Sequence, residues 1–583
     1  MKKHLLRLWL FLILLALPLC ARADEPVLGT AQADLYTAGK FPTPSMTMAI
    51  DFDVSAFNDV VYAGLSSQEE KIDVSSFGLS IDAFRSAYGE LVNAHPELFY
   101  VSSNYRYGHL DGVVVYLLPE YLYTGEDLQT RIAAFNAAVS RAAAYAGRAS
   151  TRVGKLLMAN IYFCLNFEYD TSLTNYSPDL LFSTGKGVCQ AYMLAFSAVL
   201  NQLGIANTPA TSTAMKHTWN LVQVDGNWYH IDVTWNDPVG SMPLNVHYNN
   251  FLLSHSGIMS TGHHSWAAQV SASSTKYDNA FWREMTMPLP FSGSTVYYVA
   301  CNPDTFTCAV RAHDLGSGSD TELFSYDVPY IIGGGGFDPL WVSGGRAYYT
   351  TGQVLASSAL DGSDLRVEYV CSAPGEKIWR LYMDNGTLSM FVSTGPYDSG
   401  AVLPLTAQDI RITFPAPMLE MNVWENQQLI PQLNGTDEYA LPISLTISDP
   451  ELLGIDEYGW VIPYAPGVAS IGVTVANLSA DYSVLLHSAD VLTLPADTAS
   501  IEAEAFTQTS AQEIILPEGI TAVGERAFAD CENLILATLP ATLESIDPTA
   551  FAGNDALTLL CAPGSAAEAF AAGQNIPVFL LPE

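Results

Sequence analysis

Residues 187–238 place a cysteine, a histidine and an aspartate in an order that restricts how this part of the chain can fold. They read GVCQAYMLAFSAVLNQLGIANTPATSTAMKHTWNLVQVDGNWYHIDVTWNDP. Apolar residues recur at three- and four-residue steps from Val188 to Leu203, and Gly204 follows, which predicts a helix over this stretch. Cys189 then lies in the first turn, where unpaired N–H groups and the positive end of the helix dipole favour a thiolate over a thiol.

A β-hairpin is expected after this helix. Two strand-like runs, residues 217–224 and 227–235, are separated by Asp-Gly at 225–226, a dipeptide that strongly favours a two-residue hairpin turn. This turn sets the register so that His217 and Asp232 become diagonal neighbours on one face of the hairpin. Diagonal partners lie roughly 7–8 Å apart at Cα, which is within reach of an imidazole and a carboxylate.

Cys189, His217 and Asp232 therefore form a candidate catalytic group for acyl transfer. His217 would take the thiol proton, Asp232 would orient the imidazole and stabilise its cation, and the thiolate would attack an amide carbonyl to give a thioester. The backbone N–H of Cys189 is the expected first oxyanion donor, and a second donor is not identified. Water as the acyl acceptor would make the enzyme a peptidase or deamidase, and an amine would make it a transamidase.

Each of these residues also has a structural interpretation. A free cysteine is usually a buried small hydrophobe. Asp237 is a rival to Asp232 for orienting the histidine, although it lies beyond the predicted strand and has the opposite parity. The nearby tryptophans are expected to form wall and core: Trp219, Trp228 and Trp235.

The blocks GVCQAY, HTWN and WYHIDVTWNDP resemble the three signature blocks of the transglutaminase-like superfamily, whose members share a papain-like α+β core. The resemblance extends over residues 156–254, because LLMANIYFCLNFEYD upstream and HYNNFLLS downstream also resemble the family. It implies a nucleophile at Cys189, a base at His217 and a third triad member at Asp232. The family includes peptidases, transamidases and members without known catalysis. Asn236 departs from the family pattern, because relatives often carry a second aspartate there.

Residues 1–23 have the features of a secretory signal peptide. Basic side chains are followed by an apolar run at residues 8–19 and by Ala-Arg-Ala as a cleavage site. The apolar run is too short to span a membrane as a helix, and no second long apolar stretch occurs. We therefore expect an extracellular, secreted protein that is not inserted in a membrane after signal cleavage, with association at a cell surface left open.

The charge of the chain restricts its partners. It has 24 basic and 60 acidic side chains, a formal net charge of −36, so nucleic acid and anionic membranes are not expected to bind it. Charged residues make up 14% and hydrophobic residues 49% of the sequence, which indicates a folded chain. Its 583 residues predict several domains.

No metal or cofactor is expected. The sequence contains no CxxC pair, so a zinc-ribbon or thioredoxin-like site has no support. A metallohydrolase site is a rival interpretation, but the histidines that would form it lack HExxH spacing. They are His247, His255, His263 and His264.

Seven cysteines remain after signal cleavage, and an odd number leaves at least one thiol unpaired in a monomer. This suits a reactive Cys189. Cys301 and Cys308 flank NPDTFT; they could close a hairpin as a disulfide or remain two buried thiols, and the sequence leaves both open. The other cysteines are Cys164, Cys371, Cys531 and Cys561.

Two segments surround the predicted core at residues 148–290. Residues 24–147 are predicted as an α/β preface, since amphipathic helical patterns flank PELFY and strand-like sequence.

Residues 291–412 contain short strands with Gly and Asp turns. AYYTTGQVLASSALDGSDLR within them resembles one blade of a β-propeller, but two or three such units are too few to close a ring. We expect a β-rich, propeller-like spacer.

Residues 413–495 resemble a bacterial immunoglobulin-like domain of the kind found in invasins and intimins. The residues that carry the resemblance are SLTISDPELLGIDEYGWVIPYAPGVASIGVTV. A β-sandwich of this kind acts as a spacer or a binding module.

Residues 496–583 contain a repeat with a period of 22 to 23 residues, which indicates a solenoid. The units resemble the leucine-rich repeats of bacterial surface proteins, and CAPGSAAEAFAAGQNIPV resembles their closing cap. The repeat could serve as a stabilising cap or as an attachment to a ligand or surface. Its marker positions are Phe506, Pro517, Phe528, Pro540 and Phe551.

The sequence thus predicts a multidomain secreted protein with an α+β papain-like transglutaminase core, followed by a β-rich spacer, an Ig-like β-sandwich and a short leucine-rich-repeat solenoid. The expected function is cysteine-dependent acyl transfer on peptide or protein amides. The alternative is a cell-surface adhesion or binding protein whose core is catalytically silent. Expected partners are a peptide or protein substrate and a cell-surface or glycan ligand of the C-terminal modules.

Overall fold

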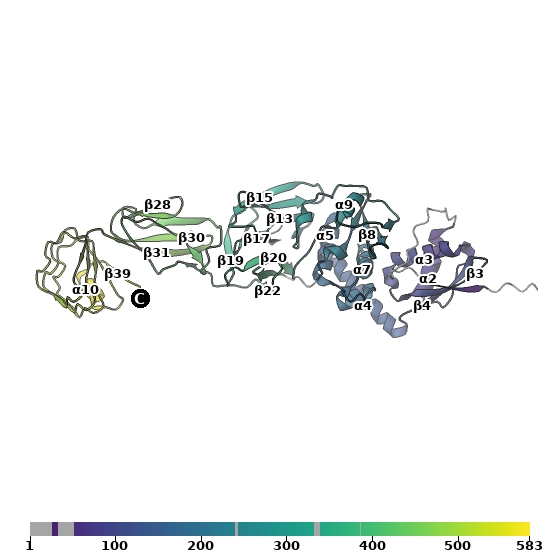
Figure 1. The fold of residues 1–583 in the computed structure, drawn as a ribbon, viewed down its shortest axis with the longest axis horizontal. Helices are drawn as coiled ribbons and strands as arrows, with labels where there is room; N and C mark the ends of the chain where they lie inside the picture. Colours follow the sequence, from purple (N-terminus) through teal and green to yellow (C-terminus); the bar gives the residue numbers. More distant parts are fainter. Residues whose placement is uncertain (1–25, 33–51, 240–242, 332–337, 385, 583) are drawn as a thin grey trace, which may run out of the picture. The chain divides into compact units, whose positions relative to one another are not determined.

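The computed structural model describes residues 26–32, 52–239, 243–331, 338–384 and 386–582, and Figure 1 colours them along the chain. The chain divides into two compact units. The first comprises Met1–Val296 with Asp314–Gly318, and the second comprises Tyr297–His313 with Ser319–Glu583. The predicted signal peptide at residues 1–23 lies outside the described residues. Within the described ranges, no helix has both the length and the apolar character needed to cross a bilayer.

The N-terminal part of the first unit is an antiparallel sheet of strand order β1-β3-β4-β2 with two helices beside it (Figure 1). Ser80 caps the second helix by accepting a hydrogen bond from the Ala83 N–H at 3.3 Å. The Phe84 ring of this helix lies 6.2 Å from the ring of Tyr105, so aromatic side chains join the helix to the sheet. The elements are β1 (Val27–Gln32), α2 (Val54–Ser66), β2 (Ile72–Asp73), α3 (Ile81–Ala94), β3 (Val101–Leu110) and β4 (Val113–Tyr121).

Four helices follow, and α7 is the central one. Every residue of α7 from Gln190 to Leu200 is buried, which is expected only for a helix with neighbours on all sides. Asn220 of the adjacent sheet donates to Ser197 Oγ at 2.8 Å, so this buried polar pair links the helix to the sheet. The helices are α4 (Gly125–Ala146), α5 (Arg152–Asn166), α6 (Pro178–Thr184) and α7 (Cys189–Gln202).

The sheet that packs against α7 is antiparallel with strand order β10-β9-β8-β7-β11. The predicted hairpin register is confirmed, because Asn220 pairs with Ile231 and Val224 pairs with Asn227. The two turn residues have φ of 50° and 79°, as a type I′ turn requires. The strands are β7 (Asn207–Ser212), β8 (His217–Val224), β9 (Asn227–Ile231), β10 (Phe251–Leu253) and β11 (Ala267–Ala268).

The predicted strand at residues 227–235 is wrong in its last part. Strand β9 ends at Ile231, and α8 (Val233–Asn236) follows it directly. Asp232 caps α8, since its carboxylate accepts from the Trp235 N–H at 3.2 Å. The Val-Thr-Trp sequence has strand propensity, but the capping aspartate before it starts a helical turn instead.

The described residues between 291 and 404 form three small sheets, with strand orders β12-β13-β14-β15, β16-β17-β18-β19 and β20-β21-β22. A disulfide joins Cys301 to Cys308 across the turn between β13 and β14, which settles the alternative that the sequence left open. The strands are β12 (Phe291–Ser292), β13 (Thr295–Asn302), β14 (Thr307–Asp314), β15 (Asp320–Asp327), β16 (Leu340–Ser343), β17 (Arg346–Thr351), β18 (Val354–Ala359), β19 (Arg366–Val370), β20 (Lys377–Asp384), β21 (Thr387–Ser393) and β22 (Ala401–Pro404).

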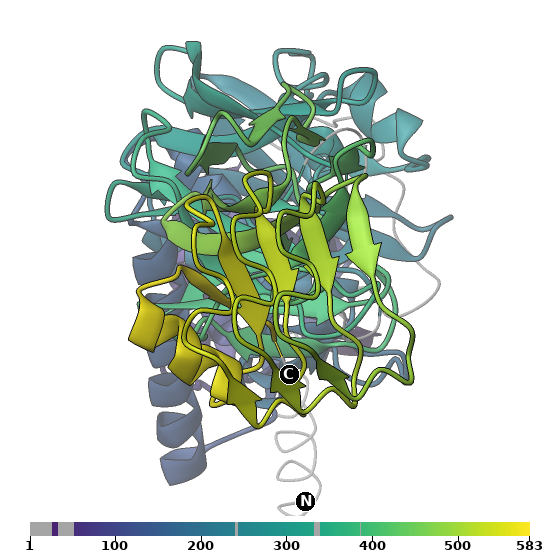
Figure 2. The same ribbon diagram turned by 90° about the vertical axis from the view of Figure 1, so that its left-hand side faces the viewer.

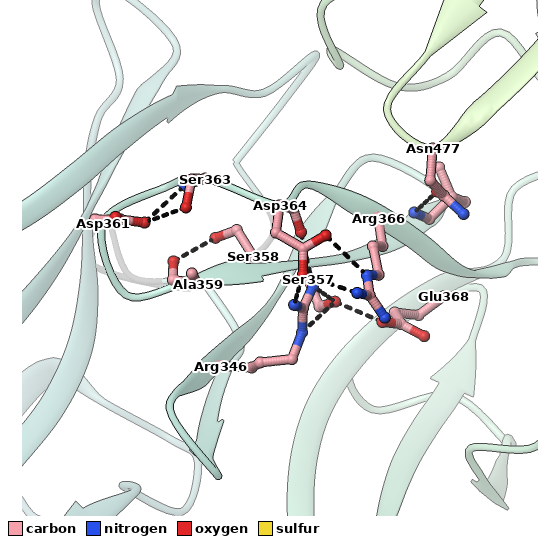
Figure 3. Close-up of polar contacts among 11 residues, drawn as sticks. Arg346, Ser357, Ser358, Ala359, Asp361, Ser363, Asp364, Arg366, Glu368 and Asn477 are labelled. Carbon is pink, nitrogen blue, oxygen red and sulfur yellow. Dashed lines mark hydrogen bonds and ion pairs between the residues drawn. The ribbon is translucent and has the colours of Figure 1, made fainter.

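A polar network connects β17, β18 and β19 (Figure 3). The Arg346 guanidinium donates to the buried Ser357 Oγ at 2.8 Å and to Asp364 Oδ2 at 2.6 Å. Arg366 donates to the same carboxylate at 2.8 Å. Separately, the Val367 N–H of β19 donates to the Asn477 side chain at 2.9 Å, so a hydrogen bond connects this sheet to the part of the second unit that follows it.

Residues 412–487 form two facing sheets, β24-β31-β30-β27 and β25-β29-β28, with a short β23-β26 pair. Strand β30 alternates buried and half-buried residues along its length, which is typical of a strand in a β-sandwich. The strands are β23 (Ile412–Thr413), β24 (Leu419–Asn422), β25 (Gln427–Gln428), β26 (Gln432–Leu433), β27 (Ile443–Ile447), β28 (Leu453–Ile455), β29 (Trp460–Pro463), β30 (Gly467–Val475) and β31 (Leu478–His487).

The C-terminal repeat is a solenoid, as its period predicted, and Figure 2 shows its parallel strands side by side. The Phe528 ring stacks between those of Phe506 and Phe551, with centroids 5.4 and 5.2 Å apart. The elements are β32 (Val491–Thr493), β33 (Ser500–Ile501), β34 (Glu513–Ile515), β35 (Ala522–Val523), β36 (Leu536–Thr538), β37 (Ser545–Ile546), β38 (Thr558–Cys561), α10 (Ala566–Gln574) and β39 (Val578–Leu580).

Candidate active site

Cys189 is the first residue of the buried helix α7. The chain enters this helix through β6 (Lys186–Gly187), which pairs in parallel with β5 (Glu168–Tyr169). Among the free cysteines of the described chain, Cys189 is the one that is partly exposed, and the others are buried. A partly exposed thiol at a helix N-terminus is accessible to a substrate, and its thiolate faces the positive end of the helix dipole.

His217 is the first residue of β8 and is 8% exposed. Its Nε2 lies 2.6 Å from Asp232 Oδ2. The imidazole stacks against Trp219, with centroids 5.6 Å apart, and against Trp235, with centroids 5.3 Å apart. The two indoles and the carboxylate together fix the plane of the ring, and because Nε2 is engaged, Nδ1 is left for the Cys189 thiol.

Asp232 is fully buried between the end of β9 and the start of α8. Its Oδ1 accepts from the Trp235 N–H at 3.2 Å, and its Oδ2 accepts from His217. A second histidine, His263, places its Nε2 2.9 Å from the same Oδ2. A buried carboxylate is costly unless it is hydrogen-bonded, and here both oxygens have donors.

These contacts shift the pKa values of the His217–Asp232 pair in opposite directions. Burial disfavours the charged form of His217, but the negative charge of Asp232, its hydrogen bond and the Cys189 thiol outweigh burial and raise the pKa of His217 to about 10. Burial likewise opposes ionisation of Asp232, but its interactions with His217 and His263 hold the pKa of that carboxyl below its usual range. The pair therefore favours an imidazolium beside a carboxylate.

Asp237, the rival orienter in the sequence, does not contact His217. It is buried and accepts a hydrogen bond from the Tyr192 hydroxyl. Burial raises the pKa of Asp237 to about 8. Among the two aspartates, Asp232 is the one that holds the histidine.

The rival metallohydrolase histidines are not gathered into one site. Of the four, only His263 belongs to a group of three metal-ligand side chains in the described chain, and its companions are His217 and Asp232. The ligand atoms of this group lie within 4.8 Å of one another. Hydrogen bonds of 2.6 and 2.9 Å join the carboxylate to both imidazoles.

The sequence did not identify His263 as part of this site. It lies 31 residues after Asp232, beyond the helix α9 (His255–Ser260), and follows no strand or helix periodicity that would orient it. The sequence offers one signal near this position. Two of the 11 histidines of the chain are adjacent here and lie just before Trp266.

An α+β core with a cysteine at the start of a buried helix, a histidine on an adjacent antiparallel hairpin and an aspartate directly after that hairpin has the arrangement expected of the transglutaminase-like class. Residues 140–233 match the family model described as the transglutaminase-like superfamily. Residues 486–570 match the model of the BspA-type leucine-rich repeat region in six copies. The chain thus combines a transglutaminase-like region with BspA-type leucine-rich repeats.

Several solved structures are similar to parts of the chain. A TGase crystal structure is 15% identical, with coverage of 26% of this chain and 48% of that chain and a TM-score of 0.17. A proposed cysteine protease from Cytophaga hutchinsonii is 16% identical, with coverage of 22% and 56% and a TM-score of 0.16. Domains 4 and 5 of the S-layer protein SbsC are 12% identical, with coverage of 17% and 65% and a TM-score of 0.13.

The chain spans less than two thirds of the length of each of these three structures. At these TM-scores the similarities carry no argument about activity. No curated protein matches the chain.

Proposed function

We propose that this protein is a secreted enzyme that performs cysteine-dependent acyl transfer on peptide or protein amides. The observation that carries the proposal is the partly exposed Cys189 at the start of α7, with the His217–Asp232 hydrogen bond of 2.6 Å beside it. A thiol that interacts with an imidazole, itself oriented by a buried carboxylate, is the arrangement that nucleophilic thiol catalysis needs.

The reaction proceeds in two halves. The Cys189 thiol gives its proton to His217 Nδ1, and the thiolate attacks the amide carbonyl. His217 then protonates the leaving amine as the C–N bond breaks, which leaves a thioester on Cys189. In the second half, His217 takes a proton from water or an amine, the new nucleophile attacks the thioester, and the proton returns to the thiolate that leaves.

Two features of the site support this reaction, one at the oxyanion and one beside the substrate. The Cys189 N–H belongs to the first turn of α7, whose N–H groups have no intrahelical acceptor, so it can donate to the oxyanion. Trp235 stacks on His217 and is 41% exposed, so it provides an apolar wall beside the imidazole for a substrate side chain.

Turnover of peptide libraries by the full chain tests the proposal. Mass spectrometry distinguishes cleavage, deamidation and amine incorporation, and the proposal expects at least one product from wild type and none from Cys189→Ala. Absence of all three products from wild type, or equal products from the variant, would contradict it.

A second candidate function is binding at a cell surface with a silent core, and the match of residues 486–570 to BspA-type repeats favours it. Its ligand would be a cell-surface protein or glycan. Cell binding by Cys189→Ala equal to wild type, together with no turnover by wild type, would favour this candidate over the enzyme.

A further inference from the structure

We propose that His263 is a positioning residue of this site, which holds Asp232 ionised and oriented so that His217 keeps its productive tautomer through both halves of the reaction. This inference rests on the proposed function. It begins from the fact that two imidazoles donate to one carboxylate oxygen, Asp232 Oδ2, at 2.6 and 2.9 Å.

The position of His263 is well defined. The residue is 1% exposed, and its ring lies 4.1 Å from the Trp235 ring and 4.7 Å from the Trp219 ring between centroids. Its Nδ1 lies 3.1 Å from Thr261 Oγ1. The same two indoles that stack on His217 therefore pack against His263, which places both imidazoles and the carboxylate in one closed group.

The hydrogen bonds of His263 permit either charge state. Thr261 Oγ1 also lies 2.8 Å from the Ile258 carbonyl. If the hydroxyl donates to that carbonyl, it accepts from Nδ1–H and the ring is an imidazolium; if it donates to Nδ1, the ring is neutral. In both cases Nε2 carries the proton that is donated to Asp232.

The chemistry explains why a second donor is needed. After His217 gives its proton to the leaving amine, it is neutral, and the fully buried Asp232 loses its cationic neighbour. His263 keeps a donor on Oδ2 at that stage. Asp232 then remains an acceptor for His217 Nε2–H, and Nδ1 stays unprotonated as the base for the second half of the reaction.

The titratable groups that face His263 are few. His217 and Asp232 contact it directly. His230 lies behind Trp219 and accepts the indole N–H at 3.0 Å. Burial, with the nearby His255 and His263, lowers the pKa of His230 to about 3, so it is neutral above that pH and adds no charge to the group.

Two amide variants separate positioning from packing. Gln at position 263 carries an N–H group near the place of Nε2, whereas Asn carries it near the place of Nδ1, too far from Asp232. His263→Asn should lower kcat by about 10- to 100-fold with KM nearly unchanged, as loss of a hydrogen bond to a charged group predicts. His263→Gln should retain most of kcat, and His264→Gln, one exposed residue further on, should match wild type.

The pH dependence of Cys189 alkylation is the second readout. His263→Asn should shift the profile toward that of an ordinary thiol, and His263→Gln should not. Equal kcat and equal profiles for both amide variants and wild type would overturn the proposal. If His263→Asn fails to fold, the test depends on His263→Gln. Loss of low-pH Cys189 alkylation in His263→Gln, at an unchanged melting temperature, would also overturn the proposal. Failure of the function itself is distinguishable, since wild type would then show neither turnover nor low-pH alkylation.

Discussion

At the scale of single residues, the account depends on the charges of His217 and Asp232. The folded pKa of His217 is raised to about 10, above the ordinary value near 6.5. This imidazolium therefore stabilises the fold fully below about pH 6.5, and its contribution is lost as the pH rises toward 10. The lowered pKa of Asp232 affects stability at acid pH. The ionised carboxylate stabilises the fold above about pH 4, and this stabilisation is lost as the pH falls further.

Asp232→Asn should abolish most activity. The amide cannot stabilise the imidazolium and can select the wrong tautomer, so kcat should fall by about 10³- to 10⁴-fold. Steady-state turnover of a peptide substrate measures this change. A loss below tenfold would contradict the role given to Asp232.

Asp237→Asn is the matched control: it should keep activity and should raise the stability of the fold at high pH. Burial raises the folded pKa of Asp237 to about 8, so the unfolded state, in which it is an ordinary carboxyl, releases a proton that the folded state keeps. Stability is therefore lost progressively from about pH 4 to pH 8. The amide should raise the free energy of unfolding by about 1–3 kcal/mol at pH 8 and little at pH 4.

Denaturant unfolding of this variant at the two pH values, with turnover measured in parallel, checks the prediction. Activity should remain within a few-fold of wild type. Equal loss of activity in Asp237→Asn and Asp232→Asn would mean that the wrong aspartate has been assigned to the histidine.

At the scale of elements, the turn into α7 requires a glycine two residues before Cys189. A Cβ added at Gly187 would lie 2.8 Å from Ala191 Cβ and 3.0 Å from Leu181 Cδ1. Gly187→Ala should therefore displace the first turn, lower the free energy of unfolding by about 1–3 kcal/mol and reduce kcat. Thermal unfolding and turnover measure the two effects. Gly89→Ala, where nothing lies within 4 Å of the added Cβ, is the control, and equal behaviour of both variants would refute the packing argument.

Local sequence signals predicted the helix and the hairpin of the candidate site, because both depend on residues that are close together in the sequence. Periodic apolar residues predicted the helix that begins at Cys189, and the Asp-Gly turn predicted the register that brings His217 near Asp232. The strand end was wrong because Asp232 serves as a helix cap, which strand propensity does not reveal. His263 could not be placed, because its contact with Asp232 depends on a tertiary arrangement that no local pattern encodes.

At the scale of the whole molecule, an ion pair between a half-buried histidine and a fully buried glutamate joins the sandwich to the solenoid within the second unit. His487 Nε2 lies 2.8 Å from Glu420 Oε1, and its Nδ1 lies 2.7 Å from an oxygen of the fully buried Glu513. The hydrogen bonds to the two glutamates, the one to Glu513 foremost, raise the pKa of His487 to about 9 against the effect of burial. The stabilisation is thus complete below about pH 6.5 and is lost as the pH rises through 9.

His487→Leu should leave Glu513 buried without its cationic partner, with the Ser488 N–H still donating to it at 2.9 Å, and lower the free energy of unfolding by about 3 kcal/mol at pH 6. The difference from wild type should shrink at pH 9.5, where the wild-type imidazole is largely neutral. Calorimetry at both pH values measures it, and a difference that does not depend on pH would contradict the charged pair.

The repeat period and the chain length of 583 residues predicted the modular character of the molecule, but the finer domain boundaries at residues 147, 290, 412 and 495 stay predictions. The choice between a disulfide and two thiols at Cys301 and Cys308 could not be made from spacing, because it depends on the hairpin that joins them. Secretion and the ligand of the repeats are likewise proposals, since both depend on the chain's surroundings.

The most direct test of the central claim is the pH dependence of Cys189 alkylation, followed by mass spectrometry in wild type and His217→Ala. The account predicts that wild type reacts readily at pH 6, well below the ordinary thiol pKa of about 8.5, and that His217→Ala loses this reactivity. The buried thiols of the same chain serve as internal controls. A Cys189 that reacts like an ordinary thiol, equally in both proteins, would contradict the thiolate–imidazolium pair and with it the enzyme.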